Sequence, residues 1–317
     1  GAPGPVDFDH LVDVDPGHSP RLTVPTSGSD ELPALGPVAG DGLWFLIRTD
    51  LRATNRPGSD LGGKLTEPAV LTERDGHLLV VTLNRPERQN AINGEMLVRL
   101  FDAFTEADEN PDIRALVLTG SGGNFCSGAD LKEMAGGHKG DSDSEIDVQA
   151  RLAEDGDLPW KALLRSWRPH VPIIAAVEGT AIAGGTELLG ATEVRVAGRA
   201  AKFGISEARW SLYPMGGSAV RIPRQIPWTV ACELLLTGDH VSAERALELG
   251  LIGHVVDDGA ALGKAIEIGQ RICSNGPLAV SAILRTLRET NGMTETEALE
   301  HEFTYGWDVF ASEDAKE

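Results

Sequence analysis

A glycine turn between an apolar run and a helix is the part of the sequence best suited to chemistry. The stretch reads VPIIAAVEGTAIAGGTE over residues 171–187. Its β-branched run, Val171 to Val177, predicts a buried strand, and Gly184-Gly185 lead into a helix with Glu187 in its first turn. Backbone N–H groups at a helix start lack intrahelical acceptors, and the helix dipole favours negative charge there. The stretch therefore predicts either a site for a negatively charged oxygen or a tight connection that uses glycine for packing alone.

Two other glycine stretches imitate known motifs without meeting them. Gly120-Ser121-Gly122-Gly123 follows a predicted strand, but the spacing of a phosphate loop is not met and no Lys-Ser/Thr follows. The run from Gly216 to Val220 nearly spells the hydrolase elbow GxSxG, but Val220 replaces the final glycine. We therefore interpret Ser218 as a residue that starts a helix.

The charge balance and the cysteines restrict the partners and the compartment. The chain has 28 Lys+Arg against 48 Asp+Glu, a formal net charge of −20, which disfavours nucleic acid and anionic membranes. Its three cysteines are far apart and not at metal spacing. They fit a reducing, cytoplasmic location and indicate neither a disulfide framework nor a metal site. No apolar run approaches the roughly 20 residues of a membrane span, and no signal peptide is recognisable.

The elements that must position the glycine turn begin at about residue 66. Residues 1–64 are rich in Pro, Gly, Asp and Ser and predict an extension with little regular structure. Residues 135–157 are polar and predict a mobile loop. Strands are predicted over 78–83, 114–119, 171–177 and 193–197, and helices over 94–107, 158–167, 228–236, 242–249, 260–273, 277–290 and 294–310. Mixed β/α structure thus comes first and helices alone come last.

Several blocks of sequence, in order, resemble those of one known family. They are LNRP at 83–86 with NAIN at 90–93, FCSGADLK at 125–132, IAAVEG at 174–179 with GGTE at 184–187, FG at 203–204 with Glu207, and LLTG at 235–238 with GLI at 250–252. The set resembles the crotonase superfamily, the enoyl-CoA hydratase/isomerase family. The resemblance covers the chain from about residue 66 onward.

This resemblance implies the fold, the domains and the partners. The expected fold class is α/β: a crotonase-like ββα spiral core over residues 65–258, followed by an all-helical trimerisation region over 259–317. A homotrimer or a hexamer built as a dimer of trimers is expected. The substrate is expected to be an acyl-CoA thioester, with coenzyme A as part of the substrate and no tightly bound cofactor.

The resemblance also assigns the catalytic residues. The backbone N–H groups of Ala129 and Gly184 are expected to hold the thioester oxygen, because fixed amides stabilise the negative charge of an enolate better than water does. Glu207 is expected to be the main acid/base at C2. Glu187 is expected to help hold and activate the water at C3. Alone, each glutamate is better explained as a solvated surface carboxylate or, for Glu187, as a first-turn partner of a helix dipole.

Contacts with coenzyme A and the acyl group are expected from a further set of residues, which the resemblance places near them: Lys132, Arg85, Arg88, Ala91, Asp130, Gly185 and Trp210. For Lys132 and the two arginines, a plain surface role is the alternative. Ser206 replaces a proline that is frequent before the second glutamate, and Trp210 is a large residue soon after it.

The expected activity is that of a lyase of the enoyl-CoA hydratase type, which adds water reversibly to a 2-enoyl-CoA, as in fatty acid metabolism. Double-bond isomerisation, thioester hydrolysis and an inactive CoA-binding paralogue are the alternatives. An isomerase needs only one proton shuttle, so the presence of both Glu187 and Glu207 favours hydration.

Overall fold

The computed structural model describes residues 67–134 and 146–312. The predicted extension, residues 1–64, and the first part of the predicted loop, residues 135–145, lie outside these ranges. No helix in the two described ranges is both long enough and apolar enough to cross a membrane.

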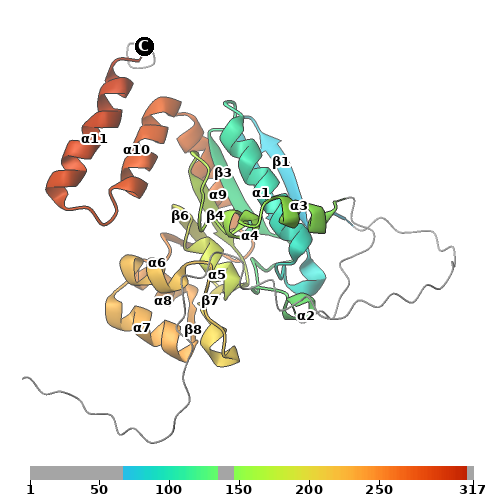
Figure 1. The fold of residues 1–317 in the computed structure, drawn as a ribbon. Coiled ribbons are helices and arrows are strands. Elements are labelled where there is room, and N and C mark those ends of the chain that lie inside the picture. The colour runs from blue at the N-terminus through green and yellow to red at the C-terminus, as the bar shows by residue number, and fades with distance from the viewer. Residues whose placement is uncertain (1–66, 135–145, 313–317) are drawn as a thin grey trace, which may run out of the picture. The chain divides into compact units, whose positions relative to one another are not determined.

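The strands of the described chain form two sheets (Figure 1). One has six strands in the order β1-β2-β3-β4-β6-β9, and the other has three in the order β5-β7-β8. The strands β2, β3, β4, β6 and β9 are parallel to one another, whereas β1 is antiparallel to β2. Their bounds are Val70–Asp75 (β1), Leu78–Leu83 (β2), Ala115–Gly120 (β3), Ile173–Val177 (β4), Thr180–Ile182 (β5), Val194–Gly198 (β6), Lys202–Gly204 (β7), His240–Ser242 (β8) and His254–Val256 (β9).

Helices cover both faces of the large sheet (Figure 1). Alternate strand residues divide between two cores: Leu79 and Leu116 belong to the core that contains α1, and Leu78 and Val117 to the core that contains α9. Burial on both faces explains why the parallel strands are almost continuously apolar. The helices are α1 (Gly94–Glu109), α2 (Leu131–Met134), α3 (Val148–Glu154), α4 (Leu158–Ala162), α5 (Gly184–Leu189), α6 (Ser218–Gln225), α7 (Trp228–Thr237), α8 (Ala243–Glu248), α9 (Ala261–Cys273), α10 (Pro277–Glu289) and α11 (Glu295–Phe310), with the 3-10 helices η2 (Pro86–Arg88) and η3 (Glu207–Trp210).

The C-terminal helices α10 and α11 form a hairpin with an exposed apolar surface. The guanidinium of Arg288 in α10 anchors the hairpin, because it pairs with Glu193 at 2.8 Å and donates to the carbonyl of Pro169 at 2.6 Å. A capping box begins α11, where Thr294 and Glu297 bond reciprocally. No residue of α11 is buried in the single chain. The exposed large apolar side chains on the two helices are Leu278, Ile283, Leu287, Leu299, Phe303, Trp307 and Phe310.

The structure confirms the predicted α/β class with helices alone at the end, and it corrects two local predictions. The loop predicted over 135–157 is wrong in its second half, where α3 forms with the Asp147 side chain accepting from the Ala150 N–H at 3.0 Å. The helix predicted over 158–167 is much shorter, because α4 ends at Ala162 and Leu164 takes a positive φ of 55°. Both errors come from side-chain and backbone details that hydrophobic periodicity does not report.

Candidate active site

The predicted site residues gather beyond the carboxyl ends of three adjacent parallel strands. The segment after β2 leads to Ala91, the segment after β3 leads to Ala129, and the segment after β4 leads to Gly184. Bridges between Ile92 and Ala129, and between Cys126 and Ala181, tie the three segments together. Ligands of parallel α/β sheets commonly bind at this edge. Three distant stretches of sequence therefore meet at one place.

Two asparagines cross-link these segments, and they were not predicted as site residues. Asn90 is fully buried; its side-chain amide donates to the carbonyls of Ser121 (2.9 Å) and Asn124 (2.8 Å) and accepts from the Arg85 N–H (2.8 Å). Asn124 accepts from the backbone N–H of Thr180 at 3.2 Å and from its hydroxyl at 3.0 Å. Each asparagine thus joins one strand-end segment to the next. In the sequence, the signal for each asparagine is a polar amide that follows soon after an apolar strand.

The backbones of Ala129 and Gly184 approach each other closely. A Cβ added to Gly184 would lie 3.6 Å from the Ala129 nitrogen and 3.5 Å from the Gly128 Cα. The bridge to Ile92 uses the Gly128 carbonyl (2.8 Å) and the Asp130 N–H (2.9 Å), which leaves the Ala129 N–H free. Gly184 is the first residue of α5, where an N–H has no intrahelical acceptor. Within the described chain, two unused backbone donors therefore lie side by side.

Backbone strain accompanies this turn. Gly128 has φ of 98°, and Ala183 has φ of 49° and ψ of −122°, a conformation that a side chain disfavours. The Ala183 N–H donates to the Gly204 carbonyl at 2.8 Å, and the Thr186 hydroxyl lies 2.9 Å from the same oxygen. These contacts with β7 hold the strained turn in place.

Glu187 is buried in α5 and faces the start of α6. Its carboxylate accepts from the Ser218 N–H at 3.2 Å. A Cβ on Gly216 would lie only 2.8 Å from the Glu187 Oε2, so glycine is required for this close approach. Burial raises the pKa of Glu187, while the amides at 216–218 and the nearby Arg221 charge oppose that rise. The site therefore holds a desolvated carboxylate with built-in donors.

Glu207 is the first residue of η3 and is only 8% exposed. Burial, followed by the negative charge of Glu187, raises the pKa of Glu207 to about 7. Its Oε2 is buried and has no hydrogen-bond partner in the described chain. Two carboxyl groups whose environments separate their pKa values can act as acid and base at neutral pH. Glu207, whose pKa is raised to about 7, is therefore the member better suited to hold a proton at neutral pH.

Three of the residues predicted to contact coenzyme A are bonded to one another. The Arg85 guanidinium pairs with Asp130 at 3.1 Å and donates to the Ala91 carbonyl at 2.5 Å. Burial acts to raise the pKa of Asp130. The hydrogen bond from Arg85 is the largest of the effects that oppose burial, and together they hold this pKa below its usual value. Arg85 therefore fixes the segment that ends near Ala129.

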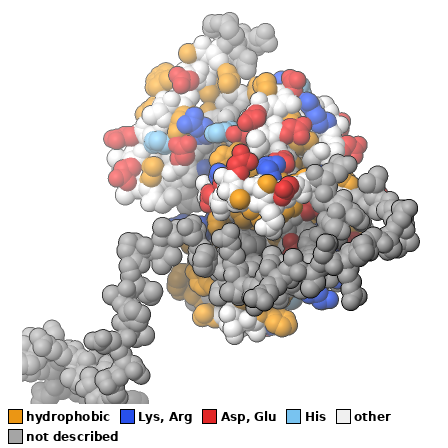
Figure 2. Space-filling view, turned by 45° about the vertical axis from the view of Figure 1, so that its right-hand side comes forward, with side chains coloured by type: hydrophobic (Ala, Val, Ile, Leu, Met, Phe, Trp, Pro, Cys, Tyr) orange, Lys and Arg blue, Asp and Glu red, His pale blue; other side chains and the backbone are white. Residues whose placement is uncertain are grey.

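The other predicted binding residues divide between the surface and the interior. Lys132 on α2 and Arg88 on η2 are exposed, and Trp210 at the end of η3 is 68% exposed. Gly185 is buried against Cys126, since an added Cβ would lie 2.4 Å from the Cys126 carbonyl oxygen. Figure 2 shows Asp and Glu side chains spread over the visible face with Lys and Arg among them. A polyanion would thus depend on individual cations such as Lys132 and Arg88.

Cys126 lies beneath the Ala129 turn. It is fully buried, and its Sγ accepts from the Gly128 N–H at 3.4 Å. Burial raises the pKa of the Cys126 thiol to about 12. The side chain therefore acts as a small apolar packing element at neutral pH.

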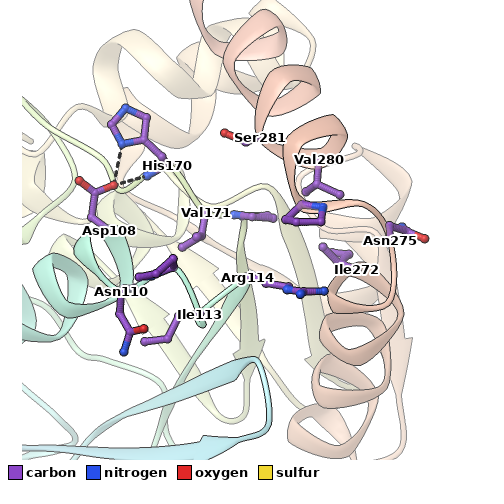
Figure 3. Close-up of a pocket in the computed structure, with 14 residues that line it drawn as sticks. Asp108, Asn110, Ile113, Arg114, His170, Val171, Ile272, Asn275, Val280 and Ser281 are labelled. Carbon is purple, nitrogen blue, oxygen red and sulfur yellow. Dashed lines mark hydrogen bonds and ion pairs between the residues drawn. The ribbon is translucent and has the colours of Figure 1, made fainter. Parts of the chain in front are cut away.

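A hollow of about 170 Å³ lies at the opposite edge of the sheet, beside the amino ends of β3 and β4 (Figure 3). It is lined by Arg114, Val171 and residues of α9 and α10. The Asp108 carboxylate and the His170 ring bond each other at 2.7 Å on its rim. Neither glutamate of the candidate site lines it. In the described chain, no group of three or more His, Cys, Asp or Glu residues could hold a metal.

Comparisons with known proteins match this chain to one family. Residues 73–317 match the family described as enoyl-CoA hydratase/isomerase. An enoyl-CoA hydratase, EchA19 of Mycobacterium tuberculosis, is 55% identical over 250 residues, which are 79% of this chain and 91% of that protein. The (E)-benzylidenesuccinyl-CoA hydratase of Thauera aromatica is 36% identical over 254 residues, 78% of this chain and 93% of that protein. The crystal structure of an enoyl-CoA hydratase from M. tuberculosis H37Rv has a TM-score of 0.71 and 40% identity, covering 79% of this chain and 94% of that one.

Proposed function

The chain belongs to the enoyl-CoA hydratase/isomerase family, and from this premise we propose that it adds water reversibly to a 2-enoyl-CoA thioester. The observation that supports this activity best is the buried pair of Glu187 and Glu207 with separated proton affinities. The pair lies with the free N–H groups of Ala129 and Gly184 beyond one edge of the sheet.

The proposed reaction is balanced by one proton shared between the two glutamates. Ionised Glu187 accepts a proton from water as the water oxygen forms a bond to C3. The electrons of the C2=C3 bond move toward the thioester oxygen, where the N–H groups of Ala129 and Gly184 stabilise the developing negative charge. The enolate then collapses, and C2 takes the proton of Glu207. The pair ends with Glu187 protonated and Glu207 ionised, so the total proton count is unchanged.

The two amides are expected to supply a large part of the rate. A preorganised donor of this kind contributes roughly 2.7–4 kcal/mol to transition-state stabilisation in other enzymes. The contacts of Ala183 and Thr186 with Gly204 fix the direction of the Gly184 amide before the substrate arrives. Preorganisation explains why a strained alanine is tolerated at position 183.

Coenzyme A is proposed to bind as part of the substrate, with no other tightly bound cofactor. Lys132 and Arg88 are exposed cations in the segments that follow β3 and β2, and we propose that they meet its phosphates. Arg85, Asp130 and Ala91 shape the adjoining segment from within. Gly185 permits the close packing under the site, and Trp210 borders the acyl group.

A panel of CoA esters tests this function. We expect crotonyl-CoA, a longer 2-enoyl-CoA or an aromatic 2-enoyl-CoA to lose conjugated thioester absorbance on incubation with the protein. A 3-enoyl-CoA and a saturated acyl-CoA, the latter followed by release of free thiol, serve as isomerase and hydrolase substrates. A Glu233→Gln variant on exposed α7 is the matched control and should retain full activity. Binding of the esters without turnover of any 2-enoyl substrate would refute the hydratase and favour an inactive paralogue.

We also propose a trimer, or a dimer of trimers, built through the region 259–317, with residues 65–258 as the catalytic core. Support comes from the exposed apolar surface of α10 and α11, which includes Phe303 (58% exposed) and Trp307 (65% exposed). Exposed apolar patches of this extent commonly mark interfaces.

Light scattering should therefore give three or six times the mass of one chain. A Phe303→Glu/Trp307→Glu variant is expected to lower that mass, because two buried carboxylates would disfavour association. Glu302→Gln on the same helix is the control. A monomeric parent protein would contradict the proposal. We further propose a cytoplasmic location, which is compatible with the free cysteines Cys126, Cys232 and Cys273.

A further inference from the structure

The hydroxyl of Ser206 does not cap the helix that follows it. Ser206 occupies the N-cap position of η3, directly before Glu207, where a serine commonly bonds the helix start. Its side chain makes no such cap. Instead, Ser206 is buried, and its Oγ lies 2.7 Å from the Nε2 of His240. The residue directly before Glu207 is thus bonded to another element, β8.

The ring of His240 also packs on β7, the strand that holds the turn at Ala183 and Gly184, which we call the oxyanion turn. His240 pairs in register with Gly204 of β7, and a Cβ on Gly204 would lie 2.2 Å from the His240 Cδ2. The carbonyl of the same Gly204 accepts from the Ala183 N–H at 2.8 Å. One imidazole therefore touches the supports of both Gly184 and Glu207.

A second contact holds the far end of η3 against the same loop. The Arg209 Nε donates to the Thr237 carbonyl at 3.1 Å, and its guanidinium pairs with Asp239. These contacts lie at the surface, so solvent screens the ion pair. At the buried Ser206 end of η3, the shorter contact of the hydroxyl is with His240 (2.7 Å), and the Gly238 carbonyl lies 3.5 Å away.

We propose that His240 is a positioning residue, which keeps the oxyanion turn and the Glu207 carboxyl group in mutual register through its contacts with Gly204 and Ser206. The inference rests on the proposed hydration and adds a group that does not touch the substrate. A shift of about 1 Å in such a constellation can cost orders of magnitude in rate.

Burial and neighbouring charges together lower the pKa of the His240 ring. Burial lowers the pKa of His240, and Arg209 of η3 and Lys202 of β7 lower it further, against the opposing charge of Asp239. A neutral ring can lie on Gly204 and share one hydrogen bond with a hydroxyl without a net charge at this position. The lowered pKa of His240 therefore favours the neutral ring in this contact.

Kinetics of Ser206→Ala and His240→Ala variants test the proposal. We expect each to lower kcat about tenfold with KM within about twofold, because substrate contacts remain and the acid is misplaced. The double variant should lose little more than either single variant, since the two residues act as one unit. His240→Gln, whose amide can replace Nε2, should recover most of kcat. His254→Ala on the exposed edge of β9 is the control.

Amide hydrogen exchange supplies a readout that does not depend on activity. Exchange over residues 204–212 should be faster in both alanine variants, while the melting temperature of the protein stays unchanged. Unaltered kcat in both variants of an active parent would overturn the proposal. So would a loss of kcat that merely follows a lowered melting temperature. An inactive parent protein would instead refute the hydratase, and the exchange result would still decide whether His240 fixes η3.

Discussion

A Glu207→Gln variant should lose about 10²–10⁴-fold in kcat, the range typical of a removed general acid or base, and should be more stable than the parent at pH 8. The loss follows because glutamine cannot give a proton to C2. The gain in stability follows because glutamine removes a carboxylate that must ionise while buried, where its Oε2 has no partner among residues 67–134 and 146–312.

The pH dependence of the stability gain has a definite sign. Folding raises the pKa of Glu207 from 4.5 to about 7, so between these values the folded protein binds more protons than the unfolded one. The contribution of Glu207 to stability is fully present below pH 4.5 and is lost as the pH rises through 7. At about 1.4 kcal/mol per pKa unit, discounted for solvent that reaches the pocket, the variant should gain about 2 kcal/mol at pH 8.

Denaturant unfolding of parent and variant at pH 5 and pH 8, with turnover measured on the same samples, checks both halves. Glu233→Gln on the surface is the control and should change neither quantity. If kcat of the variant stays within a few-fold of the parent, Glu207 is not the acid. If the difference in unfolding free energy between variant and parent is the same at pH 5 and pH 8, the carboxyl group is not desolvated.

The second large effect is expected in the pH profile of kcat/KM, which should fall about tenfold per pH unit above pH 7. The active form of the pair carries one proton, and that proton leaves Glu207 with a pKa of about 7. Below neutrality a second protonation, at Glu187, should produce the acid limb of a bell-shaped curve. The two limbs belong to the pair rather than to either residue alone.

Hydration and dehydration should share this profile. Hydration starts with the proton on Glu207 and dehydration starts with it on Glu187, but both forms contain one proton. The overall reaction neither consumes nor releases protons, so the ratio of the two kcat/KM values cannot change with pH. Glu187→Gln should move the alkaline limb of the residual activity to lower pH, because the negative charge of Glu187 is one cause of the raised Glu207 pKa.

Initial rates in both directions between pH 5.5 and 9 decide the matter, with substrate well below KM. A profile that is flat from pH 6 to 9 would remove the proposed one-proton pair. An alkaline limb that Glu187→Gln leaves in place would show that the two carboxyl groups do not interact.

The sequence was sufficient for the parts of the fold that repeat a pattern. Asn93 caps α1 through its side chain, and the apolar face beyond it is buried as periodicity predicts. Strands of three residues, such as β5 and β7, could not be predicted, since they are too short for alternation to appear. Yet β7 carries Gly204, which holds the oxyanion turn.

The candidate site was found only in part for a related reason. The resemblance pointed to Glu187 and Glu207 individually, but the pKa values of both are raised by burial, and that of Glu207 also by the charge of Glu187. Arg85 was expected to face coenzyme A, and only the fold shows its contacts with Asp130 and Ala91. The contact of Ser206 with His240 joins residues 34 positions apart and leaves no local signal.

Cys126 has a consequence for the fidelity of the chemistry. Cys126 precedes Ala129 by three residues, and the substrate is a thioester. A thiolate at this position could take the acyl group by thiol–thioester exchange. Only the thiolate attacks, and complete burial with a pKa of about 12 leaves the sulfur protonated and out of reach. The packing that supports the oxyanion turn therefore also protects the protein from acylation by its own substrate.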